Sequence, residues 1–178
     1  CREEAAVSFY VELGSGQSTA RDFAWLIDPY DDGAHAIHIA LNYQLEAQTP
    51  ALVNSGSLDS EISATLQYLA TLSAPVFLRI GGEMNLWGGD AAAFRQSYIH
   101  IANMARSMAP NVALVFSPNC ATAVGVKLAD FYPGDSYVDW VGVSLYTNRY
   151  LSYSAGAKQN DVTEMYFGFG DYADPVKS

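Results

Sequence analysis

The 178-residue sequence predicts an α/β fold of parallel strands, because apolar strand-like runs alternate along the chain with stretches at helical spacing. Five runs are rich in β-branched and aromatic residues, and they span residues 5–13, 34–43, 75–80, 111–117 and 138–146. The first two are apolar at nearly every position, which is typical of strands covered on both faces. This order of elements indicates repeated βαβ units with right-handed crossovers, and hence a parallel sheet or barrel.

Two amphipathic helices are expected between these strands. The first covers residues 58–72, where one stripe carries the large apolar side chains Leu58, Ile62, Leu66, Leu69 and Leu72. The second begins at Asp90, a good N-cap, and stops at Pro110. Its buried face is expected to hold Phe94, Tyr98, Ile101, Ala105 and Met108. The aromatic stretch at residues 20–27 is a further candidate for a helix.

Composition and charge exclude several classes of protein. Half of the residues are hydrophobic and 16% are charged, so the signature of a disordered chain is absent. Nine Lys and Arg against nineteen Asp and Glu give a formal charge of −10, which has the wrong sign for a phosphate backbone or an anionic membrane. No apolar run approaches the roughly 20 residues of a membrane-spanning helix. We therefore expect no nucleic-acid partner and no membrane partner.

The two cysteines and three histidines indicate neither a disulfide framework nor a metal centre. Cys1 and Cys120 have no second Cys or clustered His nearby, so we expect no metal and no cofactor. A different barrel enzyme, such as a metal-dependent hydrolase or an aldolase, is disfavoured for the same reason. An aldolase would also need a strand-end Lys for a Schiff base, and the sequence offers none.

The length suits one domain, yet both ends resemble cuts through a larger one. The chain enters a strand almost at once, and Asp174-Pro175 has the form of a helix start with three residues left. A barrel with eight strands usually needs roughly 250 residues. We therefore interpret residues 1–178 as a single, partial domain of the (β/α)8 barrel type, and we expect a monomer.

Polar and aromatic side chains follow the apolar runs, which is where parallel α/β folds place their chemistry. The candidates at or just after the strand ends are Glu12, Asn42, Arg79, Glu83, Asn85, Trp87, Asn119 and Tyr146. Carboxylates, amides and aromatic rings are what a sugar site requires, because a pyranose has apolar faces that stack on rings and hydroxyls that need polar partners. This mixture predicts a carbohydrate site.

Glu83 is the best-placed acid for cleaving a glycosidic bond, which needs one carboxyl to protonate the leaving oxygen and a second carboxylate. It follows two glycines, which let the backbone turn tightly at the strand end. A solvated loop carboxylate is the alternative for Glu83. Structural ion pairing is the alternative for Arg79 and Glu12, and a place in the core is the alternative for Trp87 and Tyr146.

Two other titratable residues are interpreted as structural. His38 lies inside an apolar run, so we expect a satisfied core histidine. Glu164 lies in an aromatic loop and is expected to be solvated rather than nucleophilic.

The motif RIGGEMN at residues 79–85 resembles the glycoside hydrolases of the large retaining (β/α)8-barrel clan, and most closely family 26, the β-mannanase and related endoglycanase family. The resemblance continues through FRQSYIHIANMAR, VFSPN and YVDWVGVSLY, and covers roughly residues 75–146. It implies that Glu83 is the general acid/base and that Arg79, Asn119 and Tyr146 occupy site positions. It also implies that the five strands are the second to sixth of the barrel.

The sequence departs from this family in two places. Gly82 stands where the family usually has His and the wider clan Asn, which removes an expected hydrogen-bond partner of the substrate and weakens the expectation of mannan specificity. The family takes its nucleophile from a Glu at the end of the seventh strand, which by this alignment lies beyond Ser178.

These observations predict a retaining endo-β-glycanase that hydrolyses a plant-type β-linked polysaccharide, either β-mannan or a related β-glucan or xylan. Glu83 would be the general acid/base, and the expected substrate contacts are Asn42, Arg79, Asn85, Trp87, Asn119 and Tyr146. The alternative is a catalytically inactive barrel that binds polysaccharide. We expect the 178-residue chain to be inactive by itself, and we expect an extracellular or cell-surface location.

Overall fold

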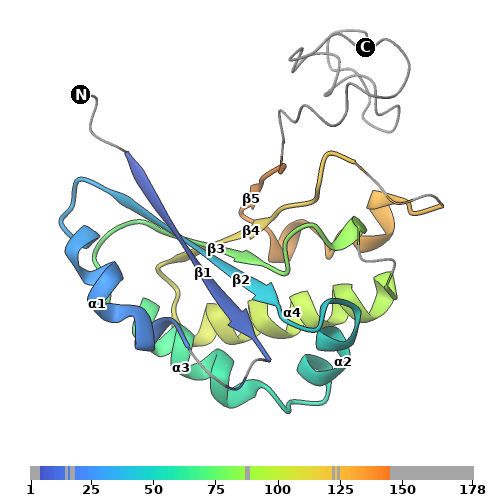
Figure 1. Cartoon of the computed structure of the whole chain (residues 1–178), viewed down its shortest axis with the longest axis horizontal. Helices are drawn as coiled ribbons and strands as arrows, with labels where there is room; N and C mark the ends of the chain where they lie inside the picture. The colour runs from blue at the N-terminus through green and yellow to red at the C-terminus, as the bar shows by residue number, and fades with distance from the viewer. Residues whose placement is uncertain are drawn as a thin grey trace, which may run out of the picture.

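The computed structural model describes residues 5–14, 16, 19–86, 89–121, 123 and 125–144. These residues form one five-stranded sheet in which all neighbouring strands are parallel and the strand order follows the chain (Figure 1). The strands are β1 (Ala6–Leu13), β2 (Ala36–Tyr43), β3 (Val76–Ile80), β4 (Val112–Phe116) and β5 (Trp140–Val141). The predicted parallel α/β architecture is confirmed, and the sequential strand order is that of a (β/α)8 barrel.

The α-helices lie on one side of this sheet (Figure 1). They are α1 (Ala24–Ile27), α2 (Thr49–Asn54), α3 (Asp59–Leu69) and α4 (Ala91–Met108). Short 3₁₀ helices accompany them: η1 (Ala20–Phe23), η2 (Asp28–Tyr30), η3 (Glu46–Gln48), η4 (Met84–Leu86), η5 (Leu128–Phe131) and η6 (Asp135–Tyr137).

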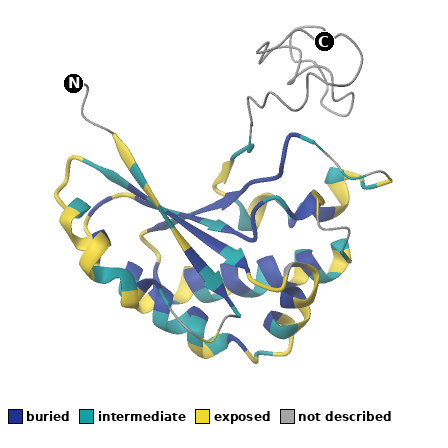
Figure 2. Cartoon of the chain, viewed as in Figure 1, coloured by how far each residue is buried: buried dark blue, intermediate teal, exposed yellow. Residues whose placement is uncertain are grey.

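The core lies between the sheet and these helices, as the burial colours show (Figure 2). All five residues of the predicted stripe at 58–72 are buried, with exposed fractions of 8% or less. The predicted face of α4 is buried too, except that Met108 is only partly buried. Asp90 is the N-cap of α4, since its carboxylate accepts the N–H groups of Ala92 and Ala93. The helical periodicity of the sequence thus predicted α3 and α4, whose apolar faces pack against the sheet.

One helix was not predicted from the sequence, and two expectations differ from the structure. The helix that was not predicted is α2. Of the strand expected at residues 138–146, residues 138–144 are described, and there β5 holds two residues while a separate bridge joins Ser144 to Asn119. Within the described residues, β1 is covered on its helix side alone, because its more exposed and more buried residues alternate and Tyr10 is 60% exposed. The concave face of the sheet, opposite the helices, bears these exposed side chains.

One aspartate fixes the connection from α3 into β3. The carboxylate of Asp31 accepts the N–H groups of Ser73 and Ala74 at 2.8 and 2.6 Å. This capping sets where β3 begins, and β3 carries the site described next.

Candidate active site

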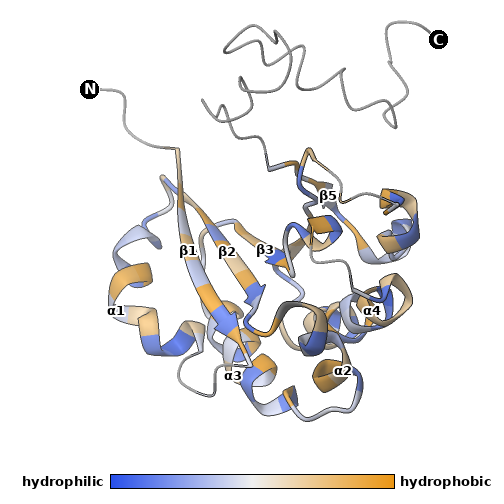
Figure 3. Cartoon of the chain, turned by 45° about the vertical axis from the view of Figure 1, so that its right-hand side comes forward, coloured by the Kyte–Doolittle hydropathy of each residue, from blue (hydrophilic) through white to orange (hydrophobic). Residues whose placement is uncertain are grey.

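The polar residues expected at the strand ends lie at the carboxyl edge of the sheet. Figure 3 shows hydrophilic residues near the tips of β1, β2 and β3, after mainly apolar strand bodies. In-register pairing sets Glu12 beside Asn42, and sets Arg79 between Ala40 and Val115. Side chains alternate along a strand, so Arg79 projects to the concave face while Leu78 and Ile80 pack into the core.

Glu83 is held at the end of β3 in a backbone conformation that L residues seldom adopt. Its φ is +64°, and it is the one non-glycine residue with positive φ in the described part of the chain. Its N–H donates to the carbonyl of Ser117 at 2.9 Å, and its carbonyl accepts the N–H of Leu86 at 3.0 Å. Such strain persists only where neighbouring groups fix it, and it concentrates at functional sites.

The two glycines before Glu83 are required for different reasons. Gly81 has φ +52°, and a Cβ there would lie 3.0 Å from the ring of Phe94 and 3.1 Å from that of Tyr43. A Cβ at Gly82 would lie 2.1 Å from Cζ of Arg79, so the guanidinium already occupies that space. The motif therefore needs the first glycine for the turn and the second for the close approach of Arg79.

The carboxylate of Glu83 lies between a cation and an amide. Nη2 of Arg79 is 3.6 Å from Oε1 of Glu83, and their side chains are 12% and 23% exposed. Nδ2 of Asn119 donates to Oε2 of Glu83 at 3.1 Å. Arg79 also donates from Nη2 to Oγ of Ser144 at 3.1 Å, which ties β3 to the segment after β5. The carboxylate is thus oriented by donors yet remains partly open to solvent.

The face of the sheet that bears Arg79 has a hollow of about 360 Å³ lined by residues of β2 to β5, including His38, Arg79, Ser117, Trp140 and Ser144. Burial, and then the charge of Arg79, lower the pKa of His38 from its usual value, which favours the neutral imidazole. Nδ1 of His38 lies 2.7 Å from the hydroxyl oxygen of Ser8.

A larger apolar hollow of about 540 Å³ includes none of the predicted site residues. It is lined by Phe116, Lys127, Leu128, Ala129, Tyr132 and Val141.

The comparison with protein families identifies the family of the chain. The model of glycosyl hydrolase family 26 matches residues 35–169, a range that contains Arg79, Glu83 and Asn119. The chain belongs to glycosyl hydrolase family 26. The family resemblance of the RIGGEMN motif is therefore confirmed.

Two curated family relatives are β-1,3-xylanases. A β-1,3-xylanase from Alcaligenes sp. is 28% identical over 141 residues, which is 76% of this chain and 28% of that protein. The β-1,3-xylanase TXYA from Vibrio sp. is 27% identical over 141 residues, which is 76% of this chain and 29% of that protein. The chain therefore spans less than a third of the length of these relatives.

A solved structure of a family 26 β-mannanase, BoMan26A from Bacteroides ovatus, has the same fold. It matches with a TM-score of 0.56 and 18% identity, over 78% of this chain and 51% of that one. At this identity the likeness concerns the fold, and it agrees with the parallel order of the five strands.

The structure places the other predicted residues of this family 26 site in three ways. Asn42 lies on the concave face and donates from Nδ2 to Oε1 of Glu12 at 3.1 Å. Asn85 is fully buried, with all of its side-chain donors directed to main-chain oxygens. Trp87, Tyr146 and Glu164 lie outside the described residues. The roles of Asn42, Asn85, Trp87 and Tyr146 as substrate contacts stay predictions.

Tyr43, which also ends β2, does not share the face of Asn42. It is 3% exposed, and its hydroxyl lies 2.9 Å from Oγ of Ser97 on α4, so it belongs to the helix side of the sheet. Burial raises the pKa of Tyr43 well above its usual value. Adjacent strand residues point to opposite faces, so Tyr43 packs on the helix side while Asn42 lies on the other face.

Two serines that hold the site together were not predicted from the sequence. Ser117 supplies the carbonyl that binds the N–H of Glu83, and Ser144 supplies the hydroxyl that binds Arg79. A signal existed for Ser144, because it is two residues before the predicted Tyr146 and a strand repeats its faces every two residues.

Neither a metal site nor a membrane span is found within the part of the chain that the structure describes. These residues contain no group of three or more His, Cys, Asp or Glu side chains that could hold a metal ion. No helix among them has the length and apolarity needed to cross a membrane.

Proposed function

We propose that the protein containing this chain is a retaining endo-β-glycanase in which Glu83 is the general acid/base. The observation that carries this proposal is the strained Glu83 at the end of β3. Its carboxylate faces Arg79 and Asn119, and its side chain is 23% exposed. A strand end of a (β/α)8-type sheet is where such a group meets substrate. Membership of family 26 supports the same reaction class.

The reaction takes place in two steps. In the first step Glu83 gives its proton to the glycosidic oxygen, the bond from C1 to that oxygen breaks, and a second carboxylate forms a bond to C1. In the second step water attacks C1, Glu83 takes a proton from that water, and the second carboxylate leaves. We propose that the second carboxylate lies outside the described residues, because the family resemblance implies a Glu beyond Ser178.

The neighbours of Glu83 assign different tasks to its two oxygens. Asn119 donates to Oε2, so Oε2 serves best as the acceptor and Oε1 as the oxygen that carries the proton. Arg79 lies 3.6 Å from Oε1, and its charge favours the carboxylate that must form when the proton leaves.

The substrate we propose is a neutral β-linked polysaccharide, with β-1,3-xylan as the first to test and β-mannan as the comparison. A formal charge of −10 disfavours a polyanionic glycan. The curated relatives are β-1,3-xylanases, whereas the mannanase likeness is one of fold. At Gly82 the space of a side chain is filled by Arg79, so the residue that most family members carry there is replaced by a guanidinium.

The test is Glu83→Gln in the complete protein, with Glu61→Gln as the matched control. Glu61 is also a partly buried glutamate, and it accepts the N–H of Gly14 on the helix side of the sheet. General acid–base catalysis contributes about 10²- to 10⁴-fold, so we expect kcat/KM on the polysaccharide to fall by at least about 100-fold for Glu83→Gln. The control should stay within about threefold of wild type.

Two further outcomes separate the proposal from its alternatives. Azide needs no base to attack C1, so added azide should restore turnover of an activated aryl glycoside by Glu83→Ala and give a glycosyl azide of retained configuration. If Glu83→Gln keeps activity within tenfold of wild type on every β-glycan tried, the assignment is wrong. Wild-type protein that binds glycans but hydrolyses none, with binding lost in Trp87→Ala, would support a binding barrel instead.

A further inference from the structure

Asn85 joins the acid/base segment to the turn after β4, although its own side chain is fully buried. Its Nδ2 donates to the carbonyl oxygens of Asn119 at 2.9 Å and Ala121 at 2.8 Å. Its Oδ1 accepts the N–H of Asn119 at 2.8 Å. A primary amide has two N–H hydrogens, and both are used by the main chain, so Asn85 has no N–H left for a sugar hydroxyl.

The amide of Asn119 is fixed as a consequence. Asn85 holds the N–H and the carbonyl of Asn119, which sets the position of that residue. The N–H of Ala121 then donates to Oδ1 of Asn119 at 2.9 Å, so the other end of the amide, Nδ2, faces Oε2 of Glu83. The main-chain bond from Glu83 to Ser117 links the same two segments.

We infer that Asn85 is a positioning residue that acts on Glu83 through Asn119 and does not contact the substrate. This inference rests on the proposed function of Glu83 as acid/base. Without Asn85, the turn at 117–121 loses three side-chain bonds, and the donor that orients Oε2 of Glu83 loses its fixed place. The carboxyl would then deliver its proton less often, while the rest of the cleft would still bind sugar.

The experiment compares two substrates that differ in their need for an acid. One is the polysaccharide that the complete wild-type protein hydrolyses best, and the other is a 2,4-dinitrophenyl β-glycoside of the same sugar, whose leaving group departs without a proton. We expect Asn85→Ala to lose at least about tenfold more kcat/KM on the polysaccharide than on the dinitrophenyl glycoside. A purely structural loss of active protein lowers both values by the same factor.

Asn111→Ala is the matched control. Nδ2 of Asn111 also donates to two carbonyl oxygens, those of Leu69 and Leu72 at 3.2 and 3.3 Å, but it lies just before β4 at the other end of the sheet. We expect its ratio of the two kcat/KM values to equal that of wild type. Asn85→Ser, which keeps a small polar side chain, serves as the second variant if Asn85→Ala does not fold.

A double variant tests the route through Asn119. If Asn85 acts only through Asn119, Asn85→Ala/Asn119→Ala should change the substrate ratio no more than Asn119→Ala does. Additive changes, or an unchanged ratio in both Asn85 variants, would overturn the inference. Glu83→Ala is measured beside them. If Glu83→Ala loses kcat/KM by the same factor on both substrates, the proposed function of Glu83 is wrong. If Glu83→Ala loses more kcat/KM on the polysaccharide while the Asn85 variants do not, only the inference about Asn85 is wrong.

Discussion

Arg79 and Gly82 depend on each other at the site. The guanidinium of Arg79 lies where the Cβ of any other residue at position 82 would lie, 2.1 Å away from it. In that place Arg79 reaches both Oε1 of Glu83 and the hydroxyl of Ser144. A side chain at position 82 would therefore change the charge beside the acid/base without removing any charged residue.

We predict that Gly82→Ala in the complete protein lowers kcat/KM by about tenfold or more, because it pushes the guanidinium away from Glu83. Removing a cation from the neighbourhood of a carboxylate favours the protonated form, so the alkaline limb of the pH–rate profile should move to higher pH. Steady-state kinetics from pH 4 to about pH 9 would measure both effects.

The control is the pair Arg79→Ala and Arg79→Ala/Gly82→Ala. Once the guanidinium is absent, the added methyl group should cost little more, so the two should have nearly the same kcat/KM. A Gly82→Ala protein with the kinetics and pH profile of wild type would show that the guanidinium moves aside without consequence.

The sequence predicted some of these residues and not others, for physical reasons. Glu83 and Asn119 could be predicted because parallel strands bring their carboxyl ends to one edge. The buried bonds of Asn85 could not, because its partners, Asn119 and Ala121, are more than thirty residues away and only the fold brings them together. The role of Gly82 also depends on where the Arg79 side chain turns.

The helix α4 supports the site from the helix side of the sheet. Phe94, in its first turn, packs against Gly81, and the hydroxyl of Ser97 meets that of Tyr43 at the end of β2. The sequence predicted α4 and its cap because an 18-residue helix shows its period clearly. The helix α2 was not predicted, because its six residues are too few to show a helical period, although Pro50 in its first turn was a signal of a helix start.

We predict that Asp90→Ala lowers the free energy of unfolding by about 1 kcal/mol, because two N–H groups at the start of α4 lose their acceptor. Urea unfolding followed by circular dichroism would measure this change. Asp90→Asn keeps a capping oxygen and should lie near wild type. Equal stability of Asp90→Ala and Asp90→Asn would contradict the prediction.

The exposed face of the sheet, opposite the helices, differs from what the apolar runs of the sequence predicted. Apolar runs predicted two covered faces for β1, yet in the described part of the chain its concave residues, such as Tyr10, remain exposed. In a barrel the inner face of a strand is covered by strands across the barrel axis, so local sequence cannot say which segment covers it. The buried residues on the helix side were predicted, because the helices that cover this side are next to the strands in the sequence.

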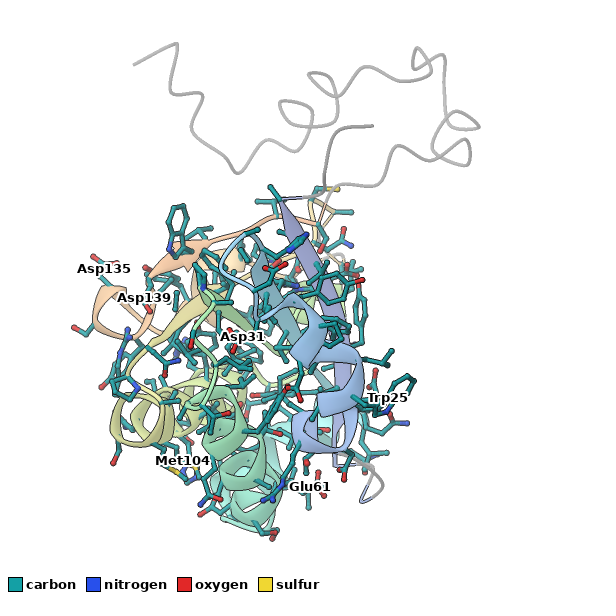
Figure 4. The ribbon with its side chains drawn as sticks, turned by 90° about the vertical axis from the view of Figure 1, so that its left-hand side faces the viewer. Trp25, Asp31, Glu61, Met104, Asp135 and Asp139 are labelled. Carbon is teal, nitrogen blue, oxygen red and sulfur yellow. The ribbon has the colours of Figure 1, made fainter. Side chains whose placement is uncertain are left out.

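The carboxylate of Asp139, just before β5, links the edge of the sheet to the helix α4. It accepts Nη2 of Arg106 on α4 at 2.8 Å and the N–H of Leu114 on β4 at 2.7 Å. Figure 4 shows Asp139 beside Asp135 on the side of the molecule opposite Trp25. The bond from Arg106, followed by the N–H of Leu114 and the charge of Arg106, holds the pKa of Asp139 below its usual value.

This shift makes stability depend on pH with a definite sign. A carboxyl whose pKa is lower in the folded state than in the unfolded state adds stability above its unfolded pKa of about 3.9, and loses that contribution as the pH falls through the folded value. Because the side chain of Asp139 is 33% exposed, solvent limits the contribution to below about 1 kcal/mol.

We therefore predict that the loss of unfolding free energy between about pH 6 and about pH 3 is smaller in Asp139→Asn than in wild type. Denaturant titrations at the two pH values would measure it, with Asp130→Asn, an exposed carboxylate on η5, as the control. An equal acid-induced loss in wild type and Asp139→Asn would show that this fastening does not depend on the charge of Asp139.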